Sequence, residues 1–402
     1  MRPVVSPAGL VAIGLIGLAG CGRIGFDVNV AGDARDRDAF GDDAATGDGA
    51  GADASAACPG LHFVSGGLVP AGNVPAALAI ADVSGDGTLD LLVVSNNTST
   101  LSVLLGAGDG TFGAEVTYAT GLVPSALVVV DVDLDGRRDV LVADAGSGTA
   151  SLLLGTGAGA FLPPLSYPVG SMAYALAAGD LDGDGDPDVA VAVAGGVDTL
   201  INNRDGTLGG QSGHPCGAGP DGVAIADLDG DARLDIAVAN RGGNTVSILR
   251  GTGGGALAPQ AAVPTGVGPT AIAIADVGGD ARPDLVVAAS NDAAVDVLLG
   301  TGTGGFGLPI AYPTQATPMS IVVADLDRDG HPDVAVANSR SASVSVLRGT
   351  NAGTFAAQVT YATGRAPSSV ATGDLDSDGT ADLAVANLGD DTVSILLGRC
   401  GP

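Results

Sequence analysis

The sequence lacks several residue types that large protein classes rely on. Its 402 residues include no lysine and no tryptophan, and all 16 basic residues are arginine. Glu115 is the single glutamate, so 44 of the 45 acidic residues are aspartate. Because glutamate, lysine and glutamine favour helices, their scarcity argues against a helical bundle. The formal net charge of −29 excludes nucleic acid as a partner, because an acidic chain repels phosphates.

Long hydrophobic runs are missing as well. Hydrophobic residues make up 46% of the chain and charged residues only 15%, a balance that would suit a membrane protein. However, no run of 18 or more apolar residues is present to cross a bilayer as a helix. We therefore expect a soluble domain whose apolar strands are buried on both faces.

The N-terminus resembles a bacterial lipoprotein signal peptide over residues 1–20. Arg2 is followed by a 13-residue apolar run over residues 8–20, which has the length of a signal peptide core. The run ends at Leu18-Ala19-Gly20-Cys21, which resembles a lipobox. That resemblance implies that Cys21 is lipidated and begins the mature chain, while an ordinary signal peptide with a chance cysteine is the alternative. Gly22, rather than aspartate, follows Cys21, and this implies delivery to the outer membrane or cell surface.

Three segments follow from this reading. Residues 1–20 are the signal peptide, and residues 21–57 are the lipidated cysteine with a disordered tether rich in Asp, Ala and Gly. Residues 58–402 form the folded domain. The only expected membrane contact is through the N-terminal lipid.

One nonapeptide recurs seven times and indicates a fold built from repeats. It begins at residues 82, 131, 180, 227, 276, 325 and 374, so the repeats are 49 residues apart except for one interval of 47. From Cys58 to Cys400 there are 343 residues, which equals seven repeats of 49. The domain therefore consists of seven whole repeats.

Each repeat contains four short runs typical of β-strands. In the sixth repeat these are residues 320–325, 333–338, 343–349 and 355–363, which are rich in Val and separated by Gly, Asn, Asp and Ser. Four strands per repeat predict an all-β, seven-bladed β-propeller of four-stranded blades. A parallel β-helix is the rival fold, but its calcium turns recur about every nine residues rather than once per 49.

Aromatic residues keep the same register. One repeat position is occupied by phenylalanine in five repeats and another, six residues later, by tyrosine in four: Phe63, Phe112, Phe161, Phe306 and Phe355, then Tyr118, Tyr167, Tyr312 and Tyr361. Aromatics at a fixed structural position indicate packing within and between blades rather than ligand stacking.

Over residues 61–398 the repeats resemble the FG-GAP/VCBS family, as in the seven-bladed propeller of integrin α subunits. Phe112-Gly113 and Phe306-Gly307 match the "FG", and residues 364–367 match the "GAP" region. The nonapeptide D-x-D-x-D-G-x-x-D matches the calcium loop of the family. The resemblance implies a propeller and calcium, but little about the ligand.

The nonapeptide also has the chemistry of a calcium loop. Aspartates at positions 1, 3, 5 and 9 supply the hard oxygens that calcium prefers, and glycine at position 6 permits a sharp turn. The loops with all four carboxylates are the second (Asp131, Asp133, Asp135, Asp139), third (Asp180, Asp182, Asp184, Asp188), fourth (Asp227, Asp229, Asp231, Asp235), sixth (Asp325, Asp327, Asp329, Asp333) and seventh (Asp374, Asp376, Asp378, Asp382).

Two loops are weaker candidates, and the fourth is imperfect. The first loop has Ser84 at position 3, beside Asp82, Asp86 and Asp90. The fifth keeps Asp276, Asp280 and Asp284 but has Gly278 at position 3 and Ala281 at position 6. The fourth has Ala232 at position 6. We therefore expect about five bound calcium ions.

No catalytic constellation is evident. The three histidines, His62, His214 and His331, lie in different repeats, and no nucleophile elbow or glutamate pair is present. The sequence favours a monomeric, calcium-binding, membrane-anchored surface module for binding or adhesion to a protein or polysaccharide. The alternatives are a glycan-active hydrolase that uses the axial pocket and a structural component of the cell envelope.

The remaining cysteines predict how the ring closes. Phe63 takes the position of a fourth strand, whereas residues 392–398 match a third strand. The N-terminal strand should therefore complete the C-terminal blade. Cys58 and Cys400 would then meet at a hairpin tip, within disulfide reach, and export permits such a bond. Cys216 would remain a free, partly buried thiol.

Overall fold

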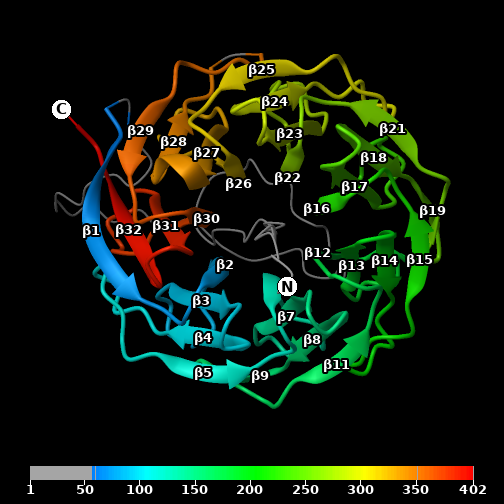
Figure 1. Cartoon of the computed structure of the whole chain (residues 1–402), viewed down its shortest axis with the longest axis horizontal. Helices are drawn as coiled ribbons and strands as arrows, with labels where there is room; N and C mark the ends of the chain where they lie inside the picture. The colour runs from blue at the N-terminus through cyan, green and yellow to red at the C-terminus, as the bar shows by residue number, and fades with distance from the viewer. Residues whose placement is uncertain (1–56, 59, 351, 402) are drawn as a thin grey trace, which may run out of the picture.

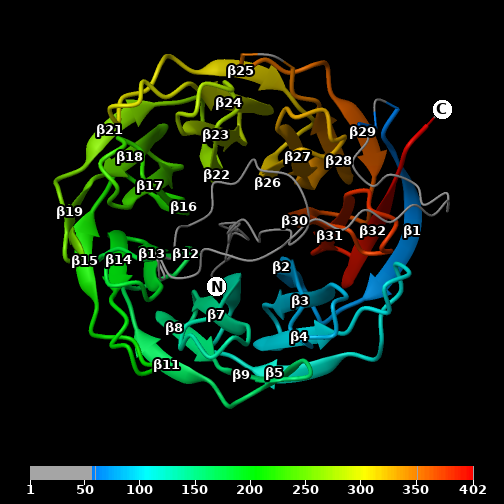
Figure 2. The same ribbon diagram turned by 180° about the vertical axis from the view of Figure 1, so that it is seen from behind.

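Seven four-stranded antiparallel sheets are arranged around a central axis (Figures 1 and 2). This computed structural model describes residues 57, 58, 60–350 and 352–401. The predicted signal peptide, Cys21 and the tether up to residue 56 lie outside the described residues. The all-β, seven-bladed propeller predicted from the repeats is confirmed. Among the described residues, no helix is long and apolar enough to cross a membrane.

Each blade is numbered after its nonapeptide, and its strands are given from the inside outward. Blades one to four are β2 (Pro75–Ala81), β3 (Asp90–Ser95), β4 (Thr100–Leu104), β5 (Val116–Ala119); β6 (Pro124–Val130), β7 (Asp139–Asp144), β8 (Thr149–Leu153), β11 (Leu165–Pro168); β12 (Ala175–Gly179), β13 (Asp188–Val193), β14 (Gly196–Leu200), β15 (Ser212–Pro215); and β16 (Pro220–Ala226), β17 (Asp235–Asn240), β18 (Thr245–Leu249), β21 (Ala261–Pro264).

Blades five to seven follow the same order. They are β22 (Pro269–Ala275), β23 (Asp284–Ala289), β24 (Ala294–Leu298), β25 (Ile310–Pro313); β26 (Pro318–Ala324), β27 (Asp333–Asn338), β28 (Ser343–Leu347), β29 (Val359–Ala362); and β30 (Pro367–Gly373), β31 (Asp382–Asn387), β32 (Thr392–Arg399), β1 (His62–Pro70). Short hairpins β9 (Gly155–Gly157) with β10 (Ala160–Phe161) and β19 (Gly251–Gly253) with β20 (Ala256–Leu257), and a single 3₁₀ turn, η1 (Ser339–Ser341), complete the described elements.

The core lies between blades, which accounts for the nearly continuous apolar strands. In β3 every residue is buried, including Leu92 and Val94 on one face. These two side chains pack in one cluster with Leu127, Val140 and Val142 of the second blade. Because each inner strand is covered by a sheet on both sides, it does not show the alternation of a half-exposed strand. The same burial explains the high hydrophobic content without a membrane.

The aromatic positions join neighbouring blades. Tyr118 of the first blade meets Phe161 of the second edge to face, with ring centroids 5.4 Å apart. The pairs Tyr312–Phe355 and Tyr361–Phe63 repeat this geometry at 5.2 Å. Edge-to-face contact at this separation is favourable for aromatic rings. The prediction that these residues pack the blades is confirmed.

The two chain ends share the seventh blade, as predicted. β1 pairs antiparallel with β32, with Phe63 opposite Gly398, and Figure 1 shows the blue and red strands side by side. Beyond this pair, the Sγ atoms of Cys58 and Cys400 lie 2.07 Å apart in a disulfide, with the Cα atoms 5.2 Å apart. Cys216 is a free, partly buried cysteine, and burial raises the pKa of its thiol to about 11.

A hydroxyl near the start of the innermost strand links neighbouring blades in three places. Thr270 Oγ1, for example, lies 3.2 Å from the carbonyl oxygen of Ala288 in its own blade and 3.1 Å from that of Pro318 in the next. Ser125 and Ser368 make the equivalent contacts. Asp221 takes this position in the fourth blade, where it is 3% exposed and its Oδ2 lacks a hydrogen-bond partner.

Replacing Asp221 with serine should stabilise the protein at alkaline pH. Burial raises the pKa of Asp221 from 3.8 to about 7, although Arg241, 3.6 Å away, opposes the shift. Between these pKa values the folded state holds a proton that the unfolded state releases, so this group makes stability fall as pH rises. We expect Asp221→Ser to raise the free energy of unfolding by about 1–3 kcal/mol at pH 8, and by less at pH 5. Urea unfolding at both pH values measures this, and an equal effect at the two would contradict it.

Candidate metal loops

The seven nonapeptides all lie on one face of the propeller. Each one connects the innermost strand of a blade to the second strand, as between β6 and β7. The innermost strands neighbour one another around the axis (Figure 1). Because the repeats have the same topology, these strands all run in the same direction and enter their loops on the same side. We call this side the aspartate face.

Backbone geometry fits the repeat sequence of the loops. Position 1 closes the turn, since Asp131 Oδ2 accepts a hydrogen bond of 2.8 Å from the backbone N–H of Gly136 at position 6. Gly136 has φ of 83°, in the left-handed region that favours glycine. Ala232 adopts φ of 65° at the same position of the fourth loop, so that loop forms with backbone strain. Position 4 is also left-handed, as Leu134 with φ of 55° shows, and the sequence pattern did not reveal this.

Position 9 anchors every loop, a role that the sequence analysis missed. Asp333 is typical: its Oδ2 accepts from the N–H of Leu326 at 3.0 Å and its Oδ1 from the N–H of Gly349 at 2.6 Å. A Cβ on Gly349 would lie 2.2 Å from the carbonyl oxygen of Pro332, which is why glycine is needed there. The equivalent carboxylates also bind at least two backbone N–H groups each, although Asp284 accepts from position 3 (Gly278) instead of position 2: Asp90, Asp139, Asp188, Asp235, Asp284 and Asp382.

Five loops bring three carboxylates together, with one oxygen of each within 4.8 Å of the others. They are the five loops that carry four aspartates in the sequence. The groups are Asp131, Asp133, Asp139; Asp180, Asp182, Asp184; Asp227, Asp229, Asp235; Asp325, Asp327, Asp333; and Asp374, Asp376, Asp382. Within the described residues, the weaker first loop (Asp82, Ser84, Asp86, Asp90) and fifth loop (Asp276, Asp280, Asp284) form no such group.

The remaining predicted ligands are not members of these groups of three. At position 5, the carboxylates of Asp135, Asp231 and Asp378 pair with arginine side chains, and Asp329 accepts the N–H of His331. Asp188 of the third loop is held by the backbone N–H groups described above. Arginines at the end of the third strand of a blade also reach the loops, as Arg399 of β32 does with Asp376 at 2.6 Å and Asp378 at 2.7 Å.

The donor set fits a hard divalent cation. In three loops the position 3 carboxylate has a buried Oδ1 without a hydrogen-bond partner, in Asp229, Asp327 and Asp376. A buried carboxylate oxygen without a partner is unfavourable unless something neutralises it. Each of these aspartates belongs to a group of three converging carboxylates. Oxygen-rich sites of this kind suit calcium better than softer metals.

The aspartates at position 9 of five loops have raised pKa values. Burial raises the pKa of Asp333 and Asp382 to about 7, and neighbouring loop carboxylates add to the shift. Burial likewise raises the pKa of Asp139, Asp188 and Asp235 to about 6. A cation at the loop would favour the charged carboxylates and so oppose these shifts.

The loops also join neighbouring blades. The position 2 carbonyl of Leu228 in the fourth loop accepts a hydrogen bond of 3.1 Å from the N–H of Gly304, which lies in the hairpin of the fifth blade. At the sixth loop the carbonyl of Asp327 accepts from the N–H of Cys58 at 2.6 Å. Ordering an aspartate loop therefore also orders a contact with the next blade.

Solved structures share the propeller at low sequence identity. BBS1N, solved in complex with ARL6DN, is 13% identical, covers 83% of this chain and 96% of its own, and has a TM-score of 0.60. Virginiamycin B lyase from Staphylococcus aureus is 14% identical over 84% and 98%, with a TM-score of 0.55. An Agrocybe aegerita lectin that recognises non-reducing terminal N-acetylglucosamine is 19% identical over 77% and 85%, with a TM-score of 0.50. At these identities the likeness shows the fold alone.

The repeats themselves match a protein family. No curated protein matches the chain. The FG-GAP-like repeat model, in contrast, matches six overlapping segments: residues 82–142, 131–191, 180–238, 227–287, 279–336 and 325–385. Together these segments cover most of the propeller and contain all five carboxylate groups. The chain therefore belongs to the FG-GAP-like repeat family.

Proposed function

We propose that this protein is a calcium-stabilised, membrane-anchored binding module that recognises carbohydrate outside the cell. The observation that carries the calcium part is the buried, unpartnered Oδ1 of Asp229, Asp327 and Asp376. In this proposal the carboxylates of the second, third, fourth, sixth and seventh loops hold the ions. Bound calcium supplies positive charge that compensates these carboxylates and holds each loop in place.

The face opposite the aspartate face is the proposed binding face. Its loops carry none of the five carboxylate groups and expose several large apolar side chains, including Leu122, Met172 and Val267. Among fold neighbours, the Agrocybe aegerita lectin supports carbohydrate as the ligand class, because it recognises a terminal N-acetylglucosamine with the same fold. Binding to a protein instead of a carbohydrate is the other outcome that the experiment below distinguishes.

A glycan and protein array, probed with and without EDTA, tests this function. We expect binding to neutral glycans in millimolar calcium and its loss after chelation, because the loops then no longer hold neighbouring blades together. Incubation of any bound glycan, followed by chromatography of the products, separates a binding module from a glycan hydrolase. Cleavage, or binding only to protein probes, would contradict the proposal.

The anchor is tested through Cys21. We expect Cys21→Ser to move the protein from the membrane fraction to the soluble fraction, because two acyl chains are needed for stable attachment. Intact-mass spectrometry of the wild-type protein should show an acylated chain that begins at Cys21. A wild-type mass without acyl groups would show that the anchor is absent.

A further inference from the structure

Two open pockets occur at the same repeat position in blades one and three. The first, of about 340 Å³, is lined by Pro70, Gly72, Thr98, Thr100, Glu115 and Thr117, among others. The second, of about 360 Å³, includes Gly170, Gln211 and Gly213, which stand where Gly72, Glu115 and Thr117 stand in the first. Both open beside the loop that leads into the innermost strand, on the face opposite the aspartate loops.

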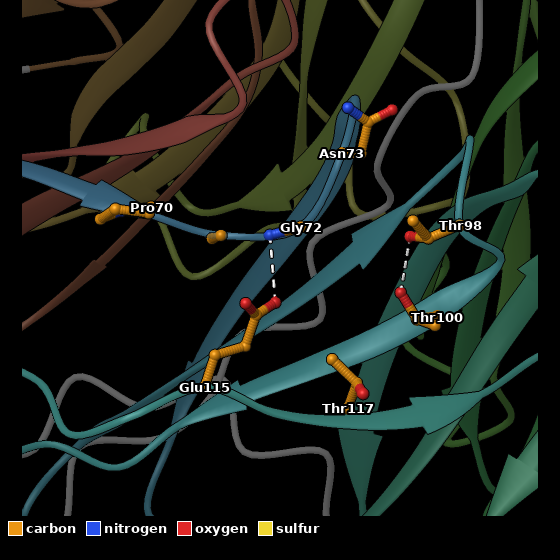
Figure 3. A pocket seen from close by; sticks show the side chains of 8 residues that line it. Pro70, Gly72, Asn73, Thr98, Thr100, Glu115 and Thr117 are labelled. Atoms are coloured by element: carbon orange, nitrogen blue, oxygen red, sulfur yellow. Dashed lines mark hydrogen bonds between the residues drawn. The ribbon is translucent and has the colours of Figure 1, made fainter.

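The first pocket contains the only glutamate of the chain. Glu115 Oε1 accepts hydrogen bonds from the N–H of Gly72, at 3.1 Å, and from the hydroxyl of Ser102. Figure 3 shows this carboxylate directed at Gly72, with the second oxygen on the side away from Thr117. Thr98 and Thr100 share a hydrogen bond of 2.8 Å on the opposite side.

Other blades show that the structural role of Glu115 does not need a charge. The same repeat position is Gln260 in blade four and Gln358 in blade six, and each amide oxygen accepts a hydrogen bond of 2.5 Å from the serine equivalent to Ser102. An uncharged amide therefore suffices for the bond from this serine, whereas the N–H of Gly217, equivalent to Gly72, donates to Ser247 instead of to Gln260. Both hydrogen bonds of Glu115 fall on Oε1, so its second oxygen and its negative charge are the features that these contacts leave unused.

The lining defines the chemistry of a ligand. The pocket offers one carboxylate, three threonine hydroxyls, the amide of Asn73 and the apolar ring of Pro70, and its lining has no cationic side chain. A carboxylate oxygen only accepts hydrogen bonds, so the ligand must donate them. The net charge of −29 disfavours an anion. We propose that the blade one pocket binds a neutral sugar unit, with Glu115 accepting from its hydroxyl groups and Pro70 contacting its C–H face.

This inference rests on the proposal that the protein binds carbohydrate, and the two can fail separately. Titration calorimetry of the purified protein in calcium would use three neutral trisaccharides (triacetylchitotriose, maltotriose and mannotriose), the amino sugar chitosan trimer and the anionic trigalacturonate. We expect binding of a neutral trisaccharide and none of trigalacturonate. Glu115→Gln should weaken that binding at least tenfold, and Thr117→Val threefold or more, with unchanged thermal unfolding.

Gln260→Ala, at the equivalent position of blade four, is the matched control and should leave the affinity unchanged. Neutral sugar binding that Glu115→Gln does not weaken would overturn the blade one pocket but keep the carbohydrate function. Tight binding of only the chitosan trimer would replace the neutral ligand with a cationic one. If the wild-type protein binds none of the five probes, both the pocket and the carbohydrate function are wrong.

Discussion

Chelation of calcium is expected to lower the midpoint of thermal unfolding by on the order of 20 °C. A ligand that binds only the native state adds RT ln(1 + [L]/Kd), about 2.7 kcal/mol per site when calcium is at 100 times its Kd. Five such sites contribute on the order of 10 kcal/mol, and about 1 kcal/mol shifts the midpoint of a large domain by about 2 °C. Calorimetry in millimolar calcium and in EDTA measures the difference.

Matched variants locate the effect in particular loops. Asp327→Asn changes a loop whose carboxylates converge, whereas Asp280→Asn changes the fifth loop, which forms no carboxylate group among the described residues. In calcium, the first variant should lose several degrees and the second should lose little. The same midpoint for the wild-type protein in calcium and in EDTA would rule out a stabilising metal.

A second large loss of stability is expected when the disulfide that closes the propeller is removed. The Cys58–Cys400 disulfide joins residues 342 apart in sequence, and in the chain-entropy model a loop of this length stabilises by up to about 5 kcal/mol. Cys58 is 1% exposed, and its N–H binds the carbonyl of Asp327 in the sixth loop. The double variant Cys58→Ser/Cys400→Ser should therefore unfold at a lower denaturant concentration and bind calcium more weakly at the sixth loop.

The control for ring opening is Cys216→Ser, which removes the free thiol without touching the closure. Denaturant unfolding of both variants, with calcium titrations of each, makes the comparison. If the double cysteine variant unfolds at the same concentration as Cys216→Ser, the disulfide does not stabilise the ring. Non-reducing peptide mapping that finds Cys58 alkylatable would exclude the bond itself.

The fold could be predicted because its evidence is periodic. A nonapeptide in phase over seven repeats fixes the number of blades, and the offset between Phe63 and residues 392–398 identifies the blade that both chain ends share. The five loops with four aspartates are also the five in which carboxylates converge. These features depend on spacing, which a sequence displays directly.

Other features depend on contacts between blades, which spacing does not display. Asp333 looked like a ligand alone, but it also binds the N–H of Leu326 and of Gly349. The sequence did contain a signal for this contact. A glycine follows position 9 by sixteen residues in six repeats, and Asn202 follows Asp188 by fourteen. No motif marks Asp221, yet it is buried where three other blades have a serine or threonine hydroxyl. The pocket at Glu115 forms from three separate segments, so no local motif marks it.

Locating the bound metal ions in a crystal tests the proposed calcium sites. Crystals grown in calcium and soaked with terbium should show anomalous peaks at five loops, between the carboxylates that begin with Asp131, Asp180, Asp227, Asp325 and Asp374. We predict no peak at the fifth loop, where Asp276, Asp280 and Asp284 form no group of converging carboxylates among the described residues. Empty density at all five carboxylate groups, in millimolar calcium, would contradict the proposed calcium sites.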